Sequence, residues 1–232
     1  QGKIELVSPK PGELWRVGRS YPIVWKTEGE IPAVRIDYSR DGFTAEAVPI
    51  IETTPNSGSY NWTVPDAISE HSQIRVSDVS DPEVQAEMEQ PFQIIPTLKL
   101  LAPNGGEVWH ALERRDISWH TIGTVPEVDL SFCKVVQRGN EEVCIQKHED
   151  FFVIDRGVMN RGIYTWDIPR LVGERLRIRI CDTRYPSICD ESDHSFSLEP
   201  QFQILHPRTA ETWTVGSEQE IRWRTFGTTA RV

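Results

Sequence analysis

Polar and apolar side chains alternate in short runs along the first part of the chain. Alternation with a period of two places successive side chains on opposite faces of a β-strand, so Ile23 and Trp25 are expected on one face. No long stretch shows the 3.6-residue period of an amphipathic helix. Gly, Pro, Asp and Asn bound the runs, as turn residues do. The pattern therefore predicts strands over 4–7, 21–27, 34–39, 45–51, 59–64, 73–78 and 92–95.

The pattern repeats along the chain. Three segments begin alike: SPKPGELWRVGRSYPIVWKTEG, APNGGEVWHALERRDISWHTIG and HPRTAETWTVGSEQEIRWRTFG. The second halves of the first two copies also match, GSYNWTVP with GIYTWDIP, once ten extra residues are allowed in the second copy. Such self-similarity is the signature of a duplicated module. We expect three domains, at 1–97, 98–201 and 202–232, of which the last is incomplete.

All eight tryptophans occupy repeated positions. A large aromatic residue at one place in every copy is typical of a core position. About seven short strands in about 95 to 105 residues fit an all-β immunoglobulin- or fibronectin III-like antiparallel sandwich, here in tandem. The predicted core residues are Trp15, Trp25, Trp62, Trp109, Trp119, Trp166, Trp213 and Trp223.

The joints between copies are short. Pro96 and Pro200 each stand at a joint, and no Gly/Ser-rich linker is present. Because proline fixes φ, neighbouring domains are expected to stack as a semi-rigid rod. The third copy is too short to bury a core alone, so its strands either continue in a longer parent protein or are completed by another chain. We favour continuation.

These motifs resemble a known family of surface domains. The pattern is Pro-x-x-Gly/Ala-Glu-x-Trp, then Trp-x-Thr-x-Gly, then Gly-x-Tyr-x-Trp-x-Val/Ile-Pro. It is similar to the Ser/Thr-rich glycosylphosphatidylinositol-anchored membrane domain, which is related to fungal cell-wall glucan-assembly proteins and frequent as tandem repeats in secreted bacterial proteins. The resemblance implies an extracellular, non-enzymatic, Ig-like module. A lipid anchor is not carried over, because no Ser/Thr-rich tail or attachment signal is seen.

All four cysteines lie in the second copy. A turn near Arg138 would place Cys133 opposite Cys144, and a turn near Tyr185 would place Cys181 opposite Cys189. Of the three connectivities that four cysteines allow, these two local pairs are favoured. A zinc site and reduced core cysteines are the alternatives, although Cys-x-x-Cys is absent.

The first copy has serines instead: Ser39 corresponds to Cys133, and Ser77 to Cys181. The fold therefore does not require the disulfides. Where they form, they place the protein outside a reducing cytosol, at the cell surface or in the extracellular space.

No catalytic motif is present. The chain has neither Gly-x-Ser-x-Gly nor a phosphate-binding glycine loop, so we predict no enzyme, no catalytic residue and no cofactor. Acidic turn residues are weak calcium candidates without EF-hand spacing, and solvated turns are the alternative. They are Asp78, Asp81, Glu83, Asp182, Asp190, Glu191 and Asp193.

Charge and hydropathy argue against nucleic acid as a partner and against a membrane-spanning segment. The net charge of -10, without clustered Lys and Arg, argues against nucleic-acid binding. No apolar run is long enough to span a membrane. Asn61 begins the sequon Asn-Trp-Thr and should face outward, since Trp62 beside it faces the core.

Three functional hypotheses remain. The first is a structural or adhesive rod in a surface, filament or surface-layer protein, with neighbouring Ig-like repeats or other copies of the chain as partners. The second is binding of glycan or cell-wall polymer through aromatics outside the cores: Phe43, Phe151, Phe152 and Tyr185. The third is a set of passive accessory repeats in a larger secreted enzyme.

Overall fold

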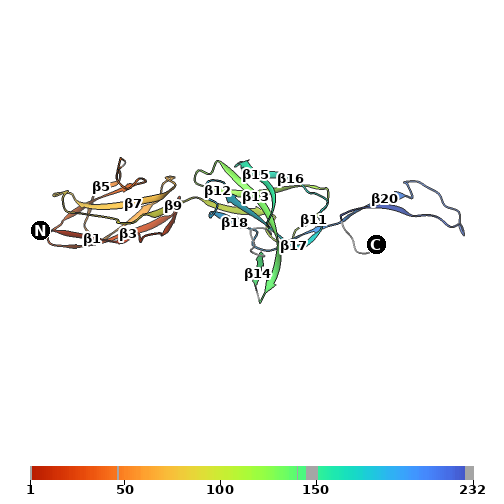
Figure 1. Ribbon diagram of the computed structural model, residues 1–232, viewed down its shortest axis with the longest axis horizontal. Helices are drawn as coiled ribbons and strands as arrows, with labels where there is room; N and C mark the ends of the chain where they lie inside the picture. Colours follow the sequence, from red (N-terminus) through yellow and green to blue (C-terminus); the bar gives the residue numbers. More distant parts are fainter. Residues whose placement is uncertain (1, 46, 140, 145–150, 228–232) are drawn as a thin grey trace. The chain divides into compact units, whose positions relative to one another are not determined.

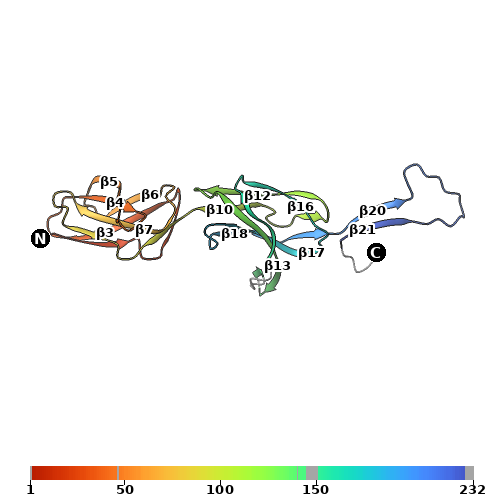
Figure 2. The ribbon, with the colours of Figure 1, turned by 45° about the horizontal axis from the view of Figure 1, so that its top comes forward.

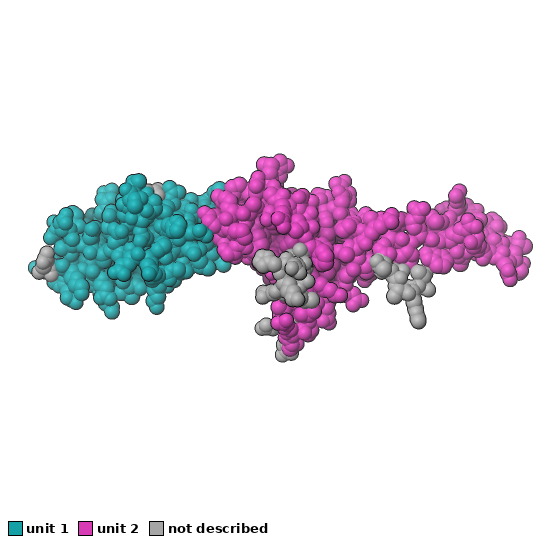
Figure 3. All heavy atoms as spheres, in the orientation of Figure 1, with its two compact units in different colours: residues 1–97, 121–124 teal, residues 98–120, 125–232 magenta. Residues whose placement is uncertain are grey.

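The computed structural model describes residues 2–45, 47–139, 141–144 and 151–227. These residues form strands joined by turns and short loops, and none of them is helical. The chain divides into two compact units: a first unit of residues 1–97 with 121–124, and a second unit of residues 98–120 with 125–232 (Figure 3).

The first unit consists of two facing sheets. One sheet has the order β1-β3-β6, and the other has the order β2-β9-β7-β4-β5, with β8 paired to β7. Figure 1 shows β1 and β3 in one layer and β5 and β7 in the other. The strands are β1 (Lys3–Ser8), β2 (Leu14–Arg16), β3 (Ser20–Glu28), β4 (Ala33–Ser39), β5 (Val48–Pro55), β6 (Ser59–Thr63), β7 (Ser69–Asp78), β8 (Gln85–Glu87) and β9 (Phe92–Ile95).

The second unit has the same strand order. Its sheets are β10-β12-β16 and β11-β19-β17-β13-β14, with β15 paired to β13 and β18 to β17. Figure 2 shows β10, β12 and β16. Among the described residues of its two facing sheets, only β14 lacks a counterpart in the first unit. The strands are β10 (Thr97–Ala102), β11 (Val108–His110), β12 (Arg114–Ile122), β13 (Glu127–Arg138), β14 (Glu141–Cys144), β15 (Phe151–Met159), β16 (Ile163–Asp167), β17 (Gly173–Asp182), β18 (Cys189–Glu191) and β19 (Phe196–Glu199).

Each unit is thus the predicted sandwich, with two refinements. β2 runs parallel to β9, and β11 runs parallel to β19, whereas pairs such as β1 with β3, β4 with β7 and β13 with β17 are antiparallel. The sequence pattern missed β2 and β8 because three residues are too few to show alternation. The strand predicted over 45–51 begins later, at Val48.

The repeated tryptophans of the two full copies lie inside the sandwiches. Trp15, Trp25 and Trp62 belong to the core of the first unit, and each is at most 7% exposed. The corresponding residues of the second unit are also buried, at most 7% exposed: Trp109, Trp119 and Trp166. The ring of Trp15 contacts Phe92 at 4.9 Å between centroids, and the ring of Trp109 contacts Phe196 at 5.4 Å. Each sandwich therefore closes around the same aromatic positions.

Trp213 and Trp223 differ, and their prediction as core residues is wrong for the structure described here. They are 39% and 45% exposed. β20 (Gln201–His206) and β21 (Arg222–Phe226) form a sheet of two strands. A core needs a second layer against which apolar side chains pack. The described part of the third copy supplies one layer.

The repeated glycines and prolines have backbone roles. Gly29, Gly123 and Gly227, which end the motif Trp-x-Thr-x-Gly, have φ of 83°, 93° and 98°. Residues with a Cβ atom rarely adopt such angles, so the turn after this strand favours glycine in each copy. The repeated prolines follow cis peptide bonds: Ser8-Pro9, Ala102-Pro103 and His206-Pro207.

Candidate functional site

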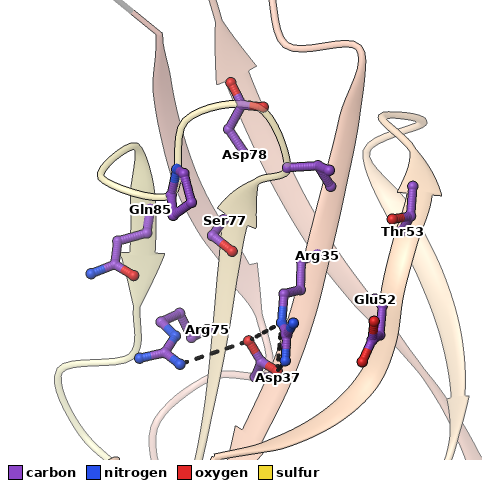
Figure 4. Close-up of a pocket in the computed structure, with 10 residues that line it drawn as sticks. Arg35, Asp37, Glu52, Thr53, Arg75, Ser77, Asp78 and Gln85 are labelled. Carbon is purple, nitrogen blue, oxygen red and sulfur yellow. Dashed lines mark hydrogen bonds and ion pairs between the residues drawn. The ribbon is translucent and has the colours of Figure 1, made fainter.

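The outer face of the larger sheet in the first unit is polar. On β4 and β7, side chains that alternate with core residues point away from the core, among them Arg35, Asp37, Arg75 and Ser77. These residues line a pocket of about 520 Å³ (Figure 4). The strand period of two therefore builds the core and the pocket from the same two strands.

Asp37 lines this pocket and is 2% exposed. Its carboxylate accepts hydrogen bonds from Nε and Nη2 of Arg35 at 3.0 and 2.9 Å, and Nη2 of Arg75 lies 3.7 Å from it. The hydrogen bonds and charge of Asp37 raise the pKa of Arg35 above its usual range. A buried carboxylate is stabilised by such pairing. Asp37 consequently holds both guanidinium groups in place.

The walls of the pocket come from other elements. β5 contributes Glu52 and Thr53, β8 contributes Gln85, and Val79 and Pro82 follow β7. The pocket thus offers hydrogen-bond donors, acceptors and some apolar surface. No histidine is among the residues that line it.

Arg75 is fixed from two further directions. Its guanidinium carbon lies 4.3 Å from the centre of the Phe43 ring, and its Nη1 lies 3.9 Å from Glu87. Phe43, which was predicted to lie outside the core, therefore contacts an arginine on the outer face.

The same face of the second unit also has a pocket, of about 320 Å³. Its chemistry differs, because Asp129 and Ser131 replace Arg35 and Asp37. Arg179 stands where the first unit has Arg75. Cys181 pairs directly with Cys189 across β17 and β18, at the register position where Ser77 pairs with Gln85 in the first unit.

Both disulfides lie in the second unit and follow the local connectivity that the spacing favoured. The expected register is wrong for one of them, because Cys144 lies opposite Val135 and not opposite Cys133 in the β13–β14 hairpin. Cys133 is bonded to Cys144, and Cys181 to Cys189, so no cysteine is free. Cys133, Cys144 and Val135 form a small buried cluster separate from the main core. The disulfides therefore reinforce the sheet from outside the sandwich core.

β14 forms a hairpin with β13 (Figure 1). The side chain of Glu142, on β14, connects this hairpin to the sandwich. Glu142 accepts hydrogen bonds from the backbone N–H and Oγ of Ser195 at 3.2 and 3.0 Å, and from Arg177 at 3.3 Å. Burial acts to raise the pKa of Glu142, but Ser195 and Arg177 outweigh it and hold the pKa below its usual range.

Two of the acidic turn residues are buried and therefore differ from the solvated turns that were the alternative to calcium binding. Asp78 and Asp182 are 5% and 0% exposed. Asp78 accepts hydrogen bonds from Oγ and the N–H of Ser80, which hold its pKa below the usual range. Asp182 accepts one from the N–H of Arg184 at 2.9 Å. Both carboxylates close the turns that follow β7 and β17.

Asp190 and Asp193 accept hydrogen bonds from protein donors. Asp193 accepts them from Lys99 at 2.9 Å and Asn104 at 2.8 Å, and Asp190 accepts one from the N–H of Leu100 at 2.7 Å.

Two of the remaining calcium candidates, Glu191 and Asp81, also have protein partners. Glu191 lies 3.7 Å from Arg179, and Asp81 accepts a hydrogen bond from the N–H of Glu83. Within the described ranges, no three His, Cys, Asp or Glu side chains gather closely enough to hold a metal. Asp190 and Asp193 both lie near Lys99, but among the described residues no three calcium candidates form one cluster.

Sequence reasoning missed two asparagines that anchor the core tryptophans. Asn56 accepts a hydrogen bond from the indole N–H of Trp25 at 2.7 Å and donates one to the carbonyl of Ile31. Asn160 accepts the corresponding bond from Trp119 at 2.6 Å. A repeated motif could have identified these asparagines, because Asn-x-Gly-x-Tyr occurs at 56–60 and at 160–164.

The aromatics proposed for glycan contact do not share one environment. Phe152 is 56% exposed and stacks on Phe132, with ring centroids 5.0 Å apart. Tyr185 is half-buried against Arg184. The side chain of Phe151 lies outside the described residues. Asn61 of the sequon is exposed, as the alternation predicted.

No family model matches the chain, and no curated protein matches it either. Solved structures similar to it include fibronectin(III)-like modules of Clostridium thermocellum CbhA (17% identity, 84% of this chain and 92% of that chain, TM-score 0.29). Others are DIP-gamma IG1+IG2 (6%, 84% and 97%, TM-score 0.30) and the N-terminal four Ig domains of Dscam1 isoform 1.9 (10%, 85% and 46%, TM-score 0.34).

No helix in the described part of the chain has the length and hydropathy needed to cross a membrane. Since the TM-scores are near 0.3, the structural class rests on the strand order of each unit. Two facing sheets of mainly antiparallel strands in this order make each unit an all-β, immunoglobulin- or fibronectin III-like sandwich.

Proposed function

We propose that this chain is a non-enzymatic structural or adhesive module, a semi-rigid spacer within a cell-surface, filament or surface-layer protein. One observation carries the proposal. β9 ends at Ile95 and β10 begins at Thr97, and β19 ends at Glu199 and β20 begins at Gln201. A single residue, Pro96 or Pro200, thus connects the strands of successive copies.

Such a joint restricts the chain far more than a flexible linker would. Proline fixes φ near −65°, and one residue leaves little freedom between the ordered strands. A protein that keeps its ends at a set distance needs this property, whereas a loosely tethered binding domain does not. The resemblance to Ser/Thr-rich glycosylphosphatidylinositol-anchored repeats supports the same role.

The two disulfides support an extracellular setting, because reducing compartments keep such thiols reduced. Thiol trapping and mass spectrometry of the protein from its natural source would test this part. We expect both pairs to be oxidised. Recovery of four free thiols would contradict the extracellular setting.

Small-angle scattering tests the spacer. The chain with its native joints should give a narrow distribution of interatomic distances. A variant with Gly-Ser-Gly inserted after Pro96 should give a broader distribution with the same folded content. A control variant with the same insertion in the exposed turn at Gly139 should give the same distance distribution as the native chain. Equal, broad distributions for the native chain and the joint variant would contradict the spacer.

If the copies are passive accessory repeats in a larger secreted enzyme, this chain should have the same fold and the same short joints as a spacer would. This hypothesis differs in requiring a catalytic domain in the parent protein. Sequencing the gene on both sides of these residues would separate the two, since further copies of the module favour the spacer.

A further inference from the structure

The pocket on the outer face of β4 and β7 has a fixed floor. Asp37 holds Nε and Nη2 of Arg35, so Nη1 of that arginine is not part of the pair. Arg75 is held by Asp37, Glu87 and the Phe43 ring. Side chains that are ordered before a ligand arrives lose less entropy on binding. The floor is therefore preorganised to donate hydrogen bonds.

The charges of the pocket select against a strong anion. Two arginines line it, and so do the carboxylates of Asp37, Glu52 and Asp78. Negative charges thus outnumber positive charges within the same pocket, and the chain as a whole carries -10. A phosphate or sulfate would have to approach these carboxylates. A neutral ligand would not be repelled.

The hydrogen-bonding groups of the walls favour a ligand with several hydroxyls. Glu52 accepts, Thr53 both donates and accepts, and Gln85 does both through its amide. Val79, which is 43% exposed, and Pro82 add an apolar patch to the same pocket. A sugar ring presents hydroxyls around its edge and C–H groups on its face, and this combination matches both kinds of surface.

The size of the pocket agrees with such a ligand. Its volume of about 520 Å³ lies within the roughly 300–1,000 Å³ usual for small-molecule sites. The pocket of the second unit is smaller, about 320 Å³, and lacks the Arg–Asp–Arg arrangement, because Ser131 replaces Asp37. The molecule thus contains its own comparison site.

We propose that the pocket formed by β4, β5, β7 and β8 of the first unit binds a neutral saccharide unit. Arg35 and Arg75 donate to ring or hydroxyl oxygens, Glu52 and Gln85 contact hydroxyls at the rim, and Val79 and Pro82 pack against a ring face. This site goes beyond the spacer role and does not depend on it. A spacer with the site would be anchored to glycan by its first unit.

Amide chemical-shift mapping on the whole chain, with its disulfides intact, tests the proposal. The probes are maltose, cellobiose and N,N′-diacetylchitobiose, with glucuronic acid and inorganic phosphate as anionic probes. We expect at least one neutral disaccharide to shift Arg35, Thr53, Arg75 and Gln85, and to leave Asp129 and Ser131 unshifted. The anionic probes should shift none of these residues.

Variants at exposed rim positions separate loss of binding from loss of fold. Glu52 and Gln85 are exposed, so E52Q and Q85A should fold normally. The double variant should bind the sugar at least about tenfold more weakly. R156A, in the pocket of the second unit, is the matched control and should bind like the native chain.

The proposal is overturned if no neutral disaccharide causes shifts, or if shifts occur only with glucuronic acid or phosphate. Shifts confined to the second unit, or unchanged affinity in the folded double variant, would also overturn it. The spacer role could survive each of these results, because scattering measures it independently.

Discussion

The two sandwiches are alike on their inner faces and different on their outer faces. Both cores contain tryptophans at the same positions, and in each the indole of the second tryptophan bonds an asparagine. On the outer face, the first unit has the Asp37 arginine network, whereas the second has two disulfides and the β14 hairpin. Packing constrains the inner positions in every copy, while outer positions can change without loss of the core.

The difference also shows two ways to hold neighbouring strands together. Asp37 on β4 bonds Arg35 of its own strand and lies near Arg75 of β7. The second unit instead joins β17 to β18 covalently through Cys181 and Cys189. A charge network leaves polar groups available to a ligand, whereas a disulfide does not. A charge network and a disulfide thus occupy the same face in different copies.

The substitutions with the largest expected effect test whether the two cores depend on their tryptophans to the same extent. Trp25→Ala and Trp119→Ala should each destabilise their own unit by about 3–5 kcal/mol, because each leaves a cavity and an unpaired asparagine. Trp223→Ala, at a residue 45% exposed, should cost less than about 1 kcal/mol. Hydrogen exchange with mass spectrometry reports each unit separately. Similar losses for Trp25 and Trp223 would break the comparison.

Exchange of the disulfide between units should have the next largest effect. C181S with C189Q gives the second unit the residues of the first and should destabilise it by about 2–3 kcal/mol, since the closed loop is short. S77C with Q85C should form a disulfide in the first unit, because these residues are directly opposed. Thiol counting and denaturant unfolding measure both. Unchanged stability of the second unit would show that its disulfide is dispensable.

Asp37→Ser gives the first unit the residue found in the second. It should destabilise the first unit by about 1–2 kcal/mol, because two arginines lose their common partner. Arg35 and Arg75 are partly exposed and can be solvated, which limits the loss. Ser131→Ala in the second unit is the control and should be nearly neutral. Denaturant unfolding of both variants decides whether the network is specific to the first unit.

The smallest expected effect is a dependence of hairpin stability on pH. The pKa of Glu142 is lowered in the folded chain, so its stabilisation is complete above the usual glutamate pKa of about 4.3. That stabilisation is lost as pH falls through the folded pKa. Amide exchange in the β13–β14 hairpin should therefore rise below about pH 4. E142Q should remove this dependence, and E174Q, at an exposed residue of β17, should retain it.

Much of the fold could be predicted from the sequence because its signals are local. Alternation within a strand identified most strands, and the repeated tryptophans of the two full copies lie in the cores. The disulfides were accessible for the same reason, since each joins residues across one turn. The same motif wrongly predicted burial of Trp213 and Trp223. Burial needs a second layer of structure, which a local motif does not supply.

The pocket could not be predicted in this way. Arg35 and Arg75 are forty residues apart in the chain, and Asp37 is one of many aspartates in the sequence. Nothing local distinguishes it from Asp78, which closes a turn. The pairing of β4 with β7 brings the three charges together.

The sequence by itself determined the class of fold, the duplicated cores and the local disulfides, because these follow from periodicity and short-range spacing. The tertiary structure alone decided the parallel pairing of β2 with β9, the burial of Asp78 and Asp182, and the pocket around Asp37. The physical reason is that hydrogen bonds and ion pairs act over a few ångströms. Which side chains come that close depends on how strands distant in sequence are aligned.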